Sequence, residues 1–167
     1  MKEQFCSSLF SGEEFGLKGS YNLSSKINPE KIKALVNIEM IGRGLYDDHH
    51  NPYITGDSCL DLRNILNDQL QKQVLAPAAK KIEFGKDRFI KDNLFRRSDN
   101  FPNALQGIPA HSIMLTFPSD SFYHSVNDEV ETLDFEDMSL IIKAIALSYS
   151  GLVTGKNTLS GIDPKKL

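Results

Sequence analysis

The sequence predicts an α/β fold in which helices cover both faces of a mixed, mostly parallel, twisted sheet, giving an αβα arrangement of three layers. Apolar runs with the length of buried strands alternate along the chain with segments whose apolar residues recur at helical spacing. Hydrophobic residues make up 40% and charged residues 25%, which is typical of a globular domain. A chain of 167 residues is long enough for one sizeable core. We therefore expect a single domain, residues 1–167, with a C-terminal tail from about 153.

The first elements follow from local composition. Residues 5–10 have the apolar content of a strand, and "EEFGLKGSYNLSSK" after them predicts a turn that continues as a short helix. Residues 32–42 are the most apolar run in this half and carry β-branched side chains, so we expect a central strand buried on both faces. The segment "PYITG" predicts a short strand.

The second half alternates in the same way. Residues 58–74 predict an amphipathic helix with Ser58 as its N-cap, and residues 80–84 predict a short strand. The segment "RRSDNFPNALQG" predicts a loop and a short helix that ends at Gly107, before the buried strand "IPAHSIMLTF". A long polar loop follows, and residues 135–152 predict a final helix with Asp134 as its N-cap.

Charge and composition exclude several function classes. The net charge of −3 gives no reason to expect a nucleic-acid partner. No apolar stretch approaches the roughly 18–20 residues of a membrane-spanning helix, so no membrane span is expected. The two cysteines, Cys6 and Cys59, define neither a disulfide framework nor a zinc ribbon.

Polar side chains follow the predicted strands, which is where open α/β sheets place their sites. Glu13 and Glu14 follow the first strand, and Glu39 lies near the end of the second. Asp99 precedes the "IPAHSIMLTF" strand and His124 lies in the loop after it. These five residues are the candidates for a functional site.

Glu39 is flanked by apolar residues, so its carboxylate is expected to lie in dry surroundings. A buried carboxylate is costly unless it is paired or bound to a metal. One interpretation is therefore an ion pair with Arg43 or Lys18, and the other is metal binding.

Glu14, Glu39 and His124 together are a plausible ligand set for zinc, which accepts imidazole nitrogen and carboxylate oxygen. Glu13, adjacent to one ligand, would then act as general base toward a water molecule. A cation would also compensate the repulsion between the neighbouring carboxylates of Glu13 and Glu14. The sequence has no His-Glu-x-x-His motif, so this hypothesis rests on residue types at strand ends.

Four blocks of sequence resemble the co-catalytic zinc exopeptidases of metallopeptidase family twenty-eight, which includes bacterial leucyl aminopeptidases, aminopeptidase Y and the glutamate carboxypeptidase II group. The blocks occur in the family's order and extend over nearly the whole chain: "FSGEEFGLKGS", "NIEMIGR", "RRSDNFPNALQGIPAHSI" and "YHSVNDEVETLDFEDM". The resemblance implies the catalytic domain of a peptidase, with a peptide as substrate. The chain is similar to the C-terminal half of that catalytic domain.

The resemblance assigns roles to individual residues. Glu13 corresponds to the general base, and Glu14, Glu39 and His124 correspond to zinc ligands. Tyr123 matches a tyrosine that lies near the substrate carbonyl in some members, where it is expected to help stabilise the tetrahedral intermediate; a packing aromatic is the alternative interpretation.

The chain departs from the family pattern at three places. Glu39 stands where many members have aspartate, and Asn100 follows Ser98-Asp99 where many have histidine. The family's other ligands, a histidine and an aspartate that bridges two zinc ions, lie upstream of the Glu-Glu pair. We therefore expect a fragment that holds at most one zinc of the two in a complete site, and that associates through an incomplete sheet.

Other signals have plainer interpretations. Asp47 to His50 is expected to be a solvated loop, and His111 a structural histidine. Arg96 and Arg97 are expected to pair with Asp99, with a substrate carboxylate as the alternative partner. The segment "GLVTGKNT" lacks the spacing of a phosphate-binding loop.

Three functions remain to be compared. The first is a zinc-dependent exopeptidase, aminopeptidase-like, although the choice between an aminopeptidase and a carboxypeptidase stays open. The second is glutaminyl cyclase, which is disfavoured because its site is lined by tryptophan and this chain has none. The third is a non-catalytic domain that keeps the fold without the chemistry. Relatives are often exported, so the complete protein is expected to be secreted or periplasmic.

Overall fold

The computed structural model describes residues 5–44, 51–56, 61–73, 79–116 and 119–167. Its elements, in chain order, are α1 (Lys18–Ser24), η1 (Pro29–Lys31), β1 (Leu35–Ile38), β2 (Tyr53–Ile54), α2 (Leu62–Gln71), η3 (Ala79–Lys81), β3 (Gly85–Lys86), η4 (Ile90–Asp92), α3 (Leu94–Arg97), α4 (Phe101–Ala104), β4 (Ala110–Met114), η5 (Val130–Thr132), α5 (Phe135–Ser148), α6 (Ser150–Val153) and η6 (Pro164–Lys166).

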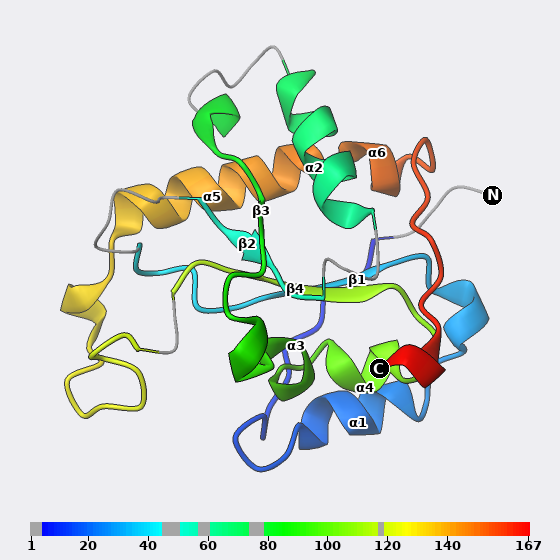
Figure 1. Cartoon of the computed structure of the whole chain (residues 1–167), viewed down its shortest axis with the longest axis horizontal. Coiled ribbons are helices and arrows are strands. Elements are labelled where there is room, and N and C mark those ends of the chain that lie inside the picture. The colour runs from blue at the N-terminus through cyan, green and yellow to red at the C-terminus, as the bar shows by residue number, and fades with distance from the viewer. Residues whose placement is uncertain (1–4, 45–50, 57–60, 74–78, 117–118) are drawn as a thin grey trace.

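The sheet has the order β1-β4-β2-β3, with β1 parallel to β4, β2 antiparallel to β4, and β3 parallel to β2. Helices α2, α5 and α6 lie on one side of it and α1, α3 and α4 on the other (Figure 1). The three-layer α/β fold with a mixed, mostly parallel sheet is therefore confirmed. None of the described helices is long and apolar enough to span a membrane.

The main core lies between the sheet and the α2–α5 layer. It is built from fully buried aliphatic and aromatic side chains, which include Leu62, Leu66, Leu70, Phe84, Ile113, Leu115 and Ile141. A smaller core on the opposite face joins Phe95, Ala104, Ala110 and Ile162. Because β4 is buried along its whole length, both faces of this strand contribute to packing, as its apolar sequence predicts.

One strand prediction is wrong, and another is right about the strand but wrong about its length and burial. Residues 5–10 form no strand, and the side chains of Phe5 and Leu9 are 77% and 100% exposed. The strand predicted at 32–42 is shorter, β1, and lies at the edge of the described sheet, where Ile38 is 48% exposed. Apolar composition indicates a strand's propensity, but the pairing partner decides whether it forms and how deeply it is buried.

Several boundaries are shifted. The strand predicted at 80–84 is displaced to β3, because Ala79–Lys81 form a 3₁₀ turn. Helix α2 is confirmed within the predicted range, whereas Ser58 and Cys59 lie outside the described residues, as does the Asp47–His50 loop. The helix predicted before Gly107 is α4, and Gly107 has a φ of 81°, a value that favours glycine at the end of a helix. The final helix is divided into α5 and α6.

The N-cap of α5 is as predicted. The Asp134 Oδ1 accepts hydrogen bonds from the backbone N–H groups of Glu136 and Asp137, at 3.1 and 3.0 Å. We expect Asp134→Ala to lower the free energy of unfolding by about 1 kcal/mol, measured by urea denaturation, because two helical N–H groups lose their acceptor. Asp134→Asn keeps a side-chain oxygen acceptor and serves as the control. Equal stability of the alanine and asparagine variants would contradict the assignment.

Candidate active site

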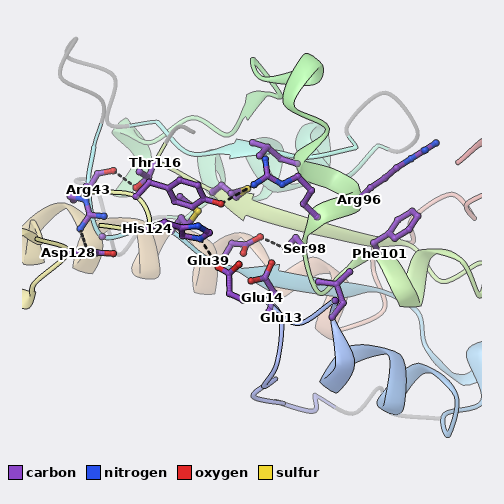
Figure 2. A pocket seen from close by; sticks show the side chains of 18 of the residues that line it. Glu13, Glu14, Glu39, Arg43, Arg96, Ser98, Phe101, Thr116, His124 and Asp128 are labelled. Carbon is purple, nitrogen blue, oxygen red and sulfur yellow. Dashed lines mark hydrogen bonds and ion pairs between the residues drawn. The ribbon is translucent and has the colours of Figure 1, made fainter. Parts of the chain in front are cut away.

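A cleft of about 770 Å³ opens where β1 and β4 end. It is lined by all five side chains given a catalytic or metal-binding role from the sequence: Glu13, Glu14, Glu39, Tyr123 and His124. Glu13 and Glu14 come from the turn before α1, Glu39 directly follows β1, and His124 comes from the loop after β4. The three glutamates and His124 gather at the same part of the cleft (Figure 2). Segments more than 100 positions apart in the chain thus meet at one place.

Glu14 and His124 are in direct contact. The His124 Nε2 lies 2.7 Å from the Glu14 Oε1, and the imidazole stacks on the Tyr123 ring with centroids 4.0 Å apart. Both side chains of the pair are more than half exposed to the cleft and solvent. The His124 backbone has a φ of 53°, in the left-handed region that a non-glycine residue seldom adopts. Backbone strain of this kind is concentrated at functional sites, where surrounding contacts hold it.

Glu39 is the most buried of the three glutamates. Burial raises the pKa of its carboxyl group, whereas hydrogen bonds from Ser98, Ser112 and Asn37 lower it; the net direction is upward. The Ser98 hydroxyl donates to the Glu39 Oε1, and the Asn37 Nδ2 donates to the same oxygen at 3.2 Å. The carboxylate is therefore held by neutral donors rather than by a cation.

The ion-pair interpretation of Glu39 is wrong. Arg43 pairs with Asp120 and Asp128, and the Lys18 Nζ lies 5.9 Å from the Phe15 ring centroid. Among the described residues, Glu39 forms no ion pair with either cation and instead accepts hydrogen bonds from Ser98 and Asn37. The other interpretation, metal binding, stays a prediction, because neutral donors already hold the carboxylate.

Glu13 has the electrostatic surroundings of a proton acceptor. Its pKa is raised first by partial burial, then by the negative charges of Glu14, Glu39 and Asp99, and lowered only by His124. A raised pKa brings a carboxylate nearer to the operating pH, where a general base is most effective. The position and the pKa of Glu13 both suit the role of base.

The chemistry of these donors fits zinc. Imidazole and carboxylate are its usual nitrogen and oxygen ligands, and the mutual repulsion of the glutamates is what a bound cation would relieve. Within the described ranges, however, no three His, Cys, Asp or Glu side chains stand close enough together to hold a metal ion. Glu14 and His124 are already paired, and Glu39 remains bonded to Ser98.

The polar support of Glu39 was not identified as a network from the sequence. Asn37 and Glu39 lie two positions apart on one face of the chain, and Asn37 pairs in register with Ser112 of β4. The Asn37 Nδ2 bonds Ser98 at 2.7 Å and Ser112 at 3.1 Å, while the Ser112 hydroxyl donates to the Asn100 Oδ1 at 2.9 Å. The only sequence signal for this network was the spacing of two positions between Asn37 and Glu39, which places both side chains on one face of an extended chain.

Arg96 and Arg97 do not pair with Asp99, which corrects that prediction. The Arg97 Nη2 donates instead to the Tyr123 hydroxyl at 3.0 Å, and Arg96 points away from the glutamates (Figure 2). The Asp99 Oδ1 is buried without a hydrogen-bond partner. The structural role of His111 is confirmed, because its ring is fully buried and its Nδ1 lies 2.8 Å from the carbonyl oxygen of Thr55.

Glu39 is expected to cost stability when no metal is bound. We expect Glu39→Gln to raise the free energy of unfolding of the metal-free chain at neutral pH by about 1 kcal/mol, because a neutral amide replaces a buried charge. A carboxyl whose folded pKa is raised stabilises the fold below its unfolded pKa and loses that contribution as the pH rises through the folded value. The gain should therefore disappear toward acid pH. Urea denaturation at several pH values measures it, and a variant less stable at neutral pH would contradict it.

Comparison with known proteins places these observations in a family context. Residues 7–148 match the model of Peptidase family M28. The fold is similar to the aminopeptidase from Aneurinibacillus sp. strain AM-1, with a TM-score of 0.60 and 20% sequence identity over 86% of this chain and 32% of that one. The chain thus spans about a third of the length of that aminopeptidase. A search of curated proteins gave no match.

Proposed function

Because the chain belongs to peptidase family M28, we propose that it contributes the catalytic residues of a zinc-dependent exopeptidase of the aminopeptidase type. The observation that carries this proposal is the contact of Glu14 with His124 in the same cleft as Glu13 and Glu39. An imidazole, three carboxylates and a phenol around one opening form a set that serves hydrolysis. The substrate would be a peptide with a free N-terminus, whose ammonium group the three glutamates of the cleft would attract.

Glu14, His124 and Glu39 would hold the metal. When bound, zinc supplies Lewis-acid chemistry, which polarises a carbonyl group and makes water more acidic. Release of Glu39 from the Ser98 hydroxyl would free the third ligand.

Glu13 would take the proton from the attacking water and deliver it to the departing amine. The Tyr123 hydroxyl accepts a hydrogen bond from Arg97, so its own proton is free to point at the substrate. Donated to the carbonyl oxygen, this proton would stabilise the negative charge that develops there.

The experiment compares an aminoacyl nitroanilide with its N-acetylated counterpart, each incubated with the zinc-loaded chain and with the chelator-treated chain. We expect cleavage of the free-amine substrate only, and only with zinc. Cleavage that persists in chelator would overturn the zinc dependence, and equal cleavage of both substrates would overturn the aminopeptidase assignment.

A non-catalytic domain is the second candidate, favoured by the position of Glu39 apart from the Glu14–His124 pair. Zinc content separates the two proposals. A chain that takes up no zinc from a micromolar solution and cleaves neither substrate supports the non-catalytic role.

A further inference from the structure

Any role of His124 requires that its loop be held in place, because the imidazole itself has little packing. Its side chain is 53% exposed, and the interactions that it makes with described residues are with the Tyr123 ring and the Glu14 carboxylate. The loop between β4 and α5 contains no strand or α-helix in its described part, residues 115–116 and 119–134. Something outside the loop must therefore fix the position of His124.

Arg43 contacts this loop on both sides of His124. Its Nε lies 2.8 Å from the Asp120 Oδ2, and its Nη1 lies 2.7 Å from the Asp128 Oδ1 and 3.0 Å from the Thr132 Oγ1. The guanidinium also lies 5.1 Å from the centroid of the Phe122 ring. The planar, multidentate guanidinium is the side chain best suited to join several acceptors at once.

Asp120 connects Arg43 to the turn that carries Tyr123 and His124, because it binds both. One oxygen of its carboxylate binds Arg43, and the other accepts the backbone N–H of Phe122 at 3.1 Å. Its carbonyl oxygen accepts the N–H of Tyr123 at 3.0 Å. Because the Asp120 side chain is only 3% exposed, this contact is shielded from solvent and from salt.

The segment that carries Arg43 is the one that carries Glu39. The Gly42 carbonyl accepts the Asp134 N–H at 2.8 Å, and the Arg43 carbonyl accepts the Thr116 hydroxyl at 2.9 Å. The end of β1 is therefore the common support of Glu39 and of the loop. Figure 2 shows Arg43 with Asp128 at one end of the view and His124 next to the glutamates.

We propose that Arg43 is a positioning residue, whose ion pairs with Asp120 and Asp128 fix the loop on the end of β1 and so place His124 against Glu14. The positioning of His124 can be measured in the metal-free chain, whereas its consequence for zinc rests on the proposed function. Residues that orient metal ligands typically change metal affinity 10–100-fold when they are mutated.

The test compares Arg43→Gln, Arg43→Lys and Asp128→Asn with the wild-type chain. Lys72→Gln is the matched control, because it removes one positive charge from an exposed ion pair with Asp68 on α2. Two readouts are taken below the melting temperature of every variant: the NMR signals of the His124 ring in metal-free protein, and the zinc dissociation constant from calorimetry. Neither readout responds to a loss of stability alone while the chain remains folded.

We expect Arg43→Gln to move the His124 signals toward those of a free imidazole and to weaken zinc binding 10–100-fold. Arg43→Lys, which keeps the charge, and Asp128→Asn, which removes only the outer partner, should lie between wild type and Arg43→Gln. Wild-type His124 signals and zinc affinity in the folded Arg43→Gln variant would overturn the proposal, and so would an equal effect of Lys72→Gln.

Two further outcomes are also decisive. If Arg43→Gln does not fold, the lysine variant and Asp128→Asn decide: intermediate His124 shifts support the proposal and wild-type signals overturn it. If the wild-type chain binds no zinc, the zinc site of the proposed function fails, and the His124 signals alone decide the role of Arg43.

Discussion

Glu13→Gln is expected to lower the rate of peptide hydrolysis by the zinc-loaded chain by a factor of about 10²–10⁴, the usual contribution of a general base. Glutamine has the same shape but cannot take a proton from water. The pKa of the Glu13 carboxyl is raised by burial and by Glu14, Glu39 and Asp99, which suits a proton acceptor. Steady-state kinetics with an aminoacyl nitroanilide measures the effect.

The pattern of the kinetic constants distinguishes a base from a ligand. A base acts in the transition state, so kcat should fall while the zinc dissociation constant stays at the wild-type value. Glu30→Gln makes the same chemical change at an exposed position of η1, outside the residues that line the cleft, and should retain full activity. If Glu13→Gln weakened zinc binding as strongly as it slowed hydrolysis, Glu13 would be a ligand rather than the base.

The layers of the fold could be predicted because buried strands and helices have recognisable patterns of apolar residues. The fully buried β4 and the capped helix α5 lie where their apolar runs and Asp134 place them. The sequence-based prediction was wrong for segments whose structure depends on pairing with another strand. Residues 5–10 have strand-like composition but no strand to pair with among the described residues, and β1 lacks a neighbour on one side within the described sheet. Pairing between distant segments is a property of the whole fold.

In the candidate site, too, residues with a local sequence signal were predicted, and contacts between distant segments were not. Of the five strand-end candidates, Glu13, Glu14, Glu39 and His124 line one cleft together with Tyr123, whereas Asp99 is not among its lining residues. The roles of these side chains remain predictions. The residues that support them were missed. Arg43 meets Asp120 and Asp128 across 77 and 85 positions, and Ser98 meets Glu39 across 59. No short-range pattern encodes such pairs, because each partner alone resembles an ordinary polar residue.

His124→Ala is expected to remove most of the zinc affinity of the chain, by about 100-fold or more, since loss of a ligand should exceed the effect of losing a residue that orients one. Zinc that binds only the folded state stabilises it by about 2.7 kcal/mol when its concentration is 100 times the dissociation constant. At the same concentration a 100-fold weaker variant gains only about 0.4 kcal/mol, so the zinc-induced rise in melting temperature should be large for the wild type and small for the variant. Thermal denaturation with and without zinc measures both.

A substitution elsewhere in the loop that carries His124 serves as the control for His124→Ala. Asn127 is exposed on the same loop and does not line the cleft, so Asn127→Ala should keep the full response to zinc. Glu39→Gln should lose the zinc response as His124→Ala does, yet begin from a more stable metal-free chain, because it also removes a buried charge. His124→Ala has no such gain, since the imidazole is exposed. A full zinc response in His124→Ala would show that the metal binds elsewhere and would remove Glu14 and Glu39 as its partners.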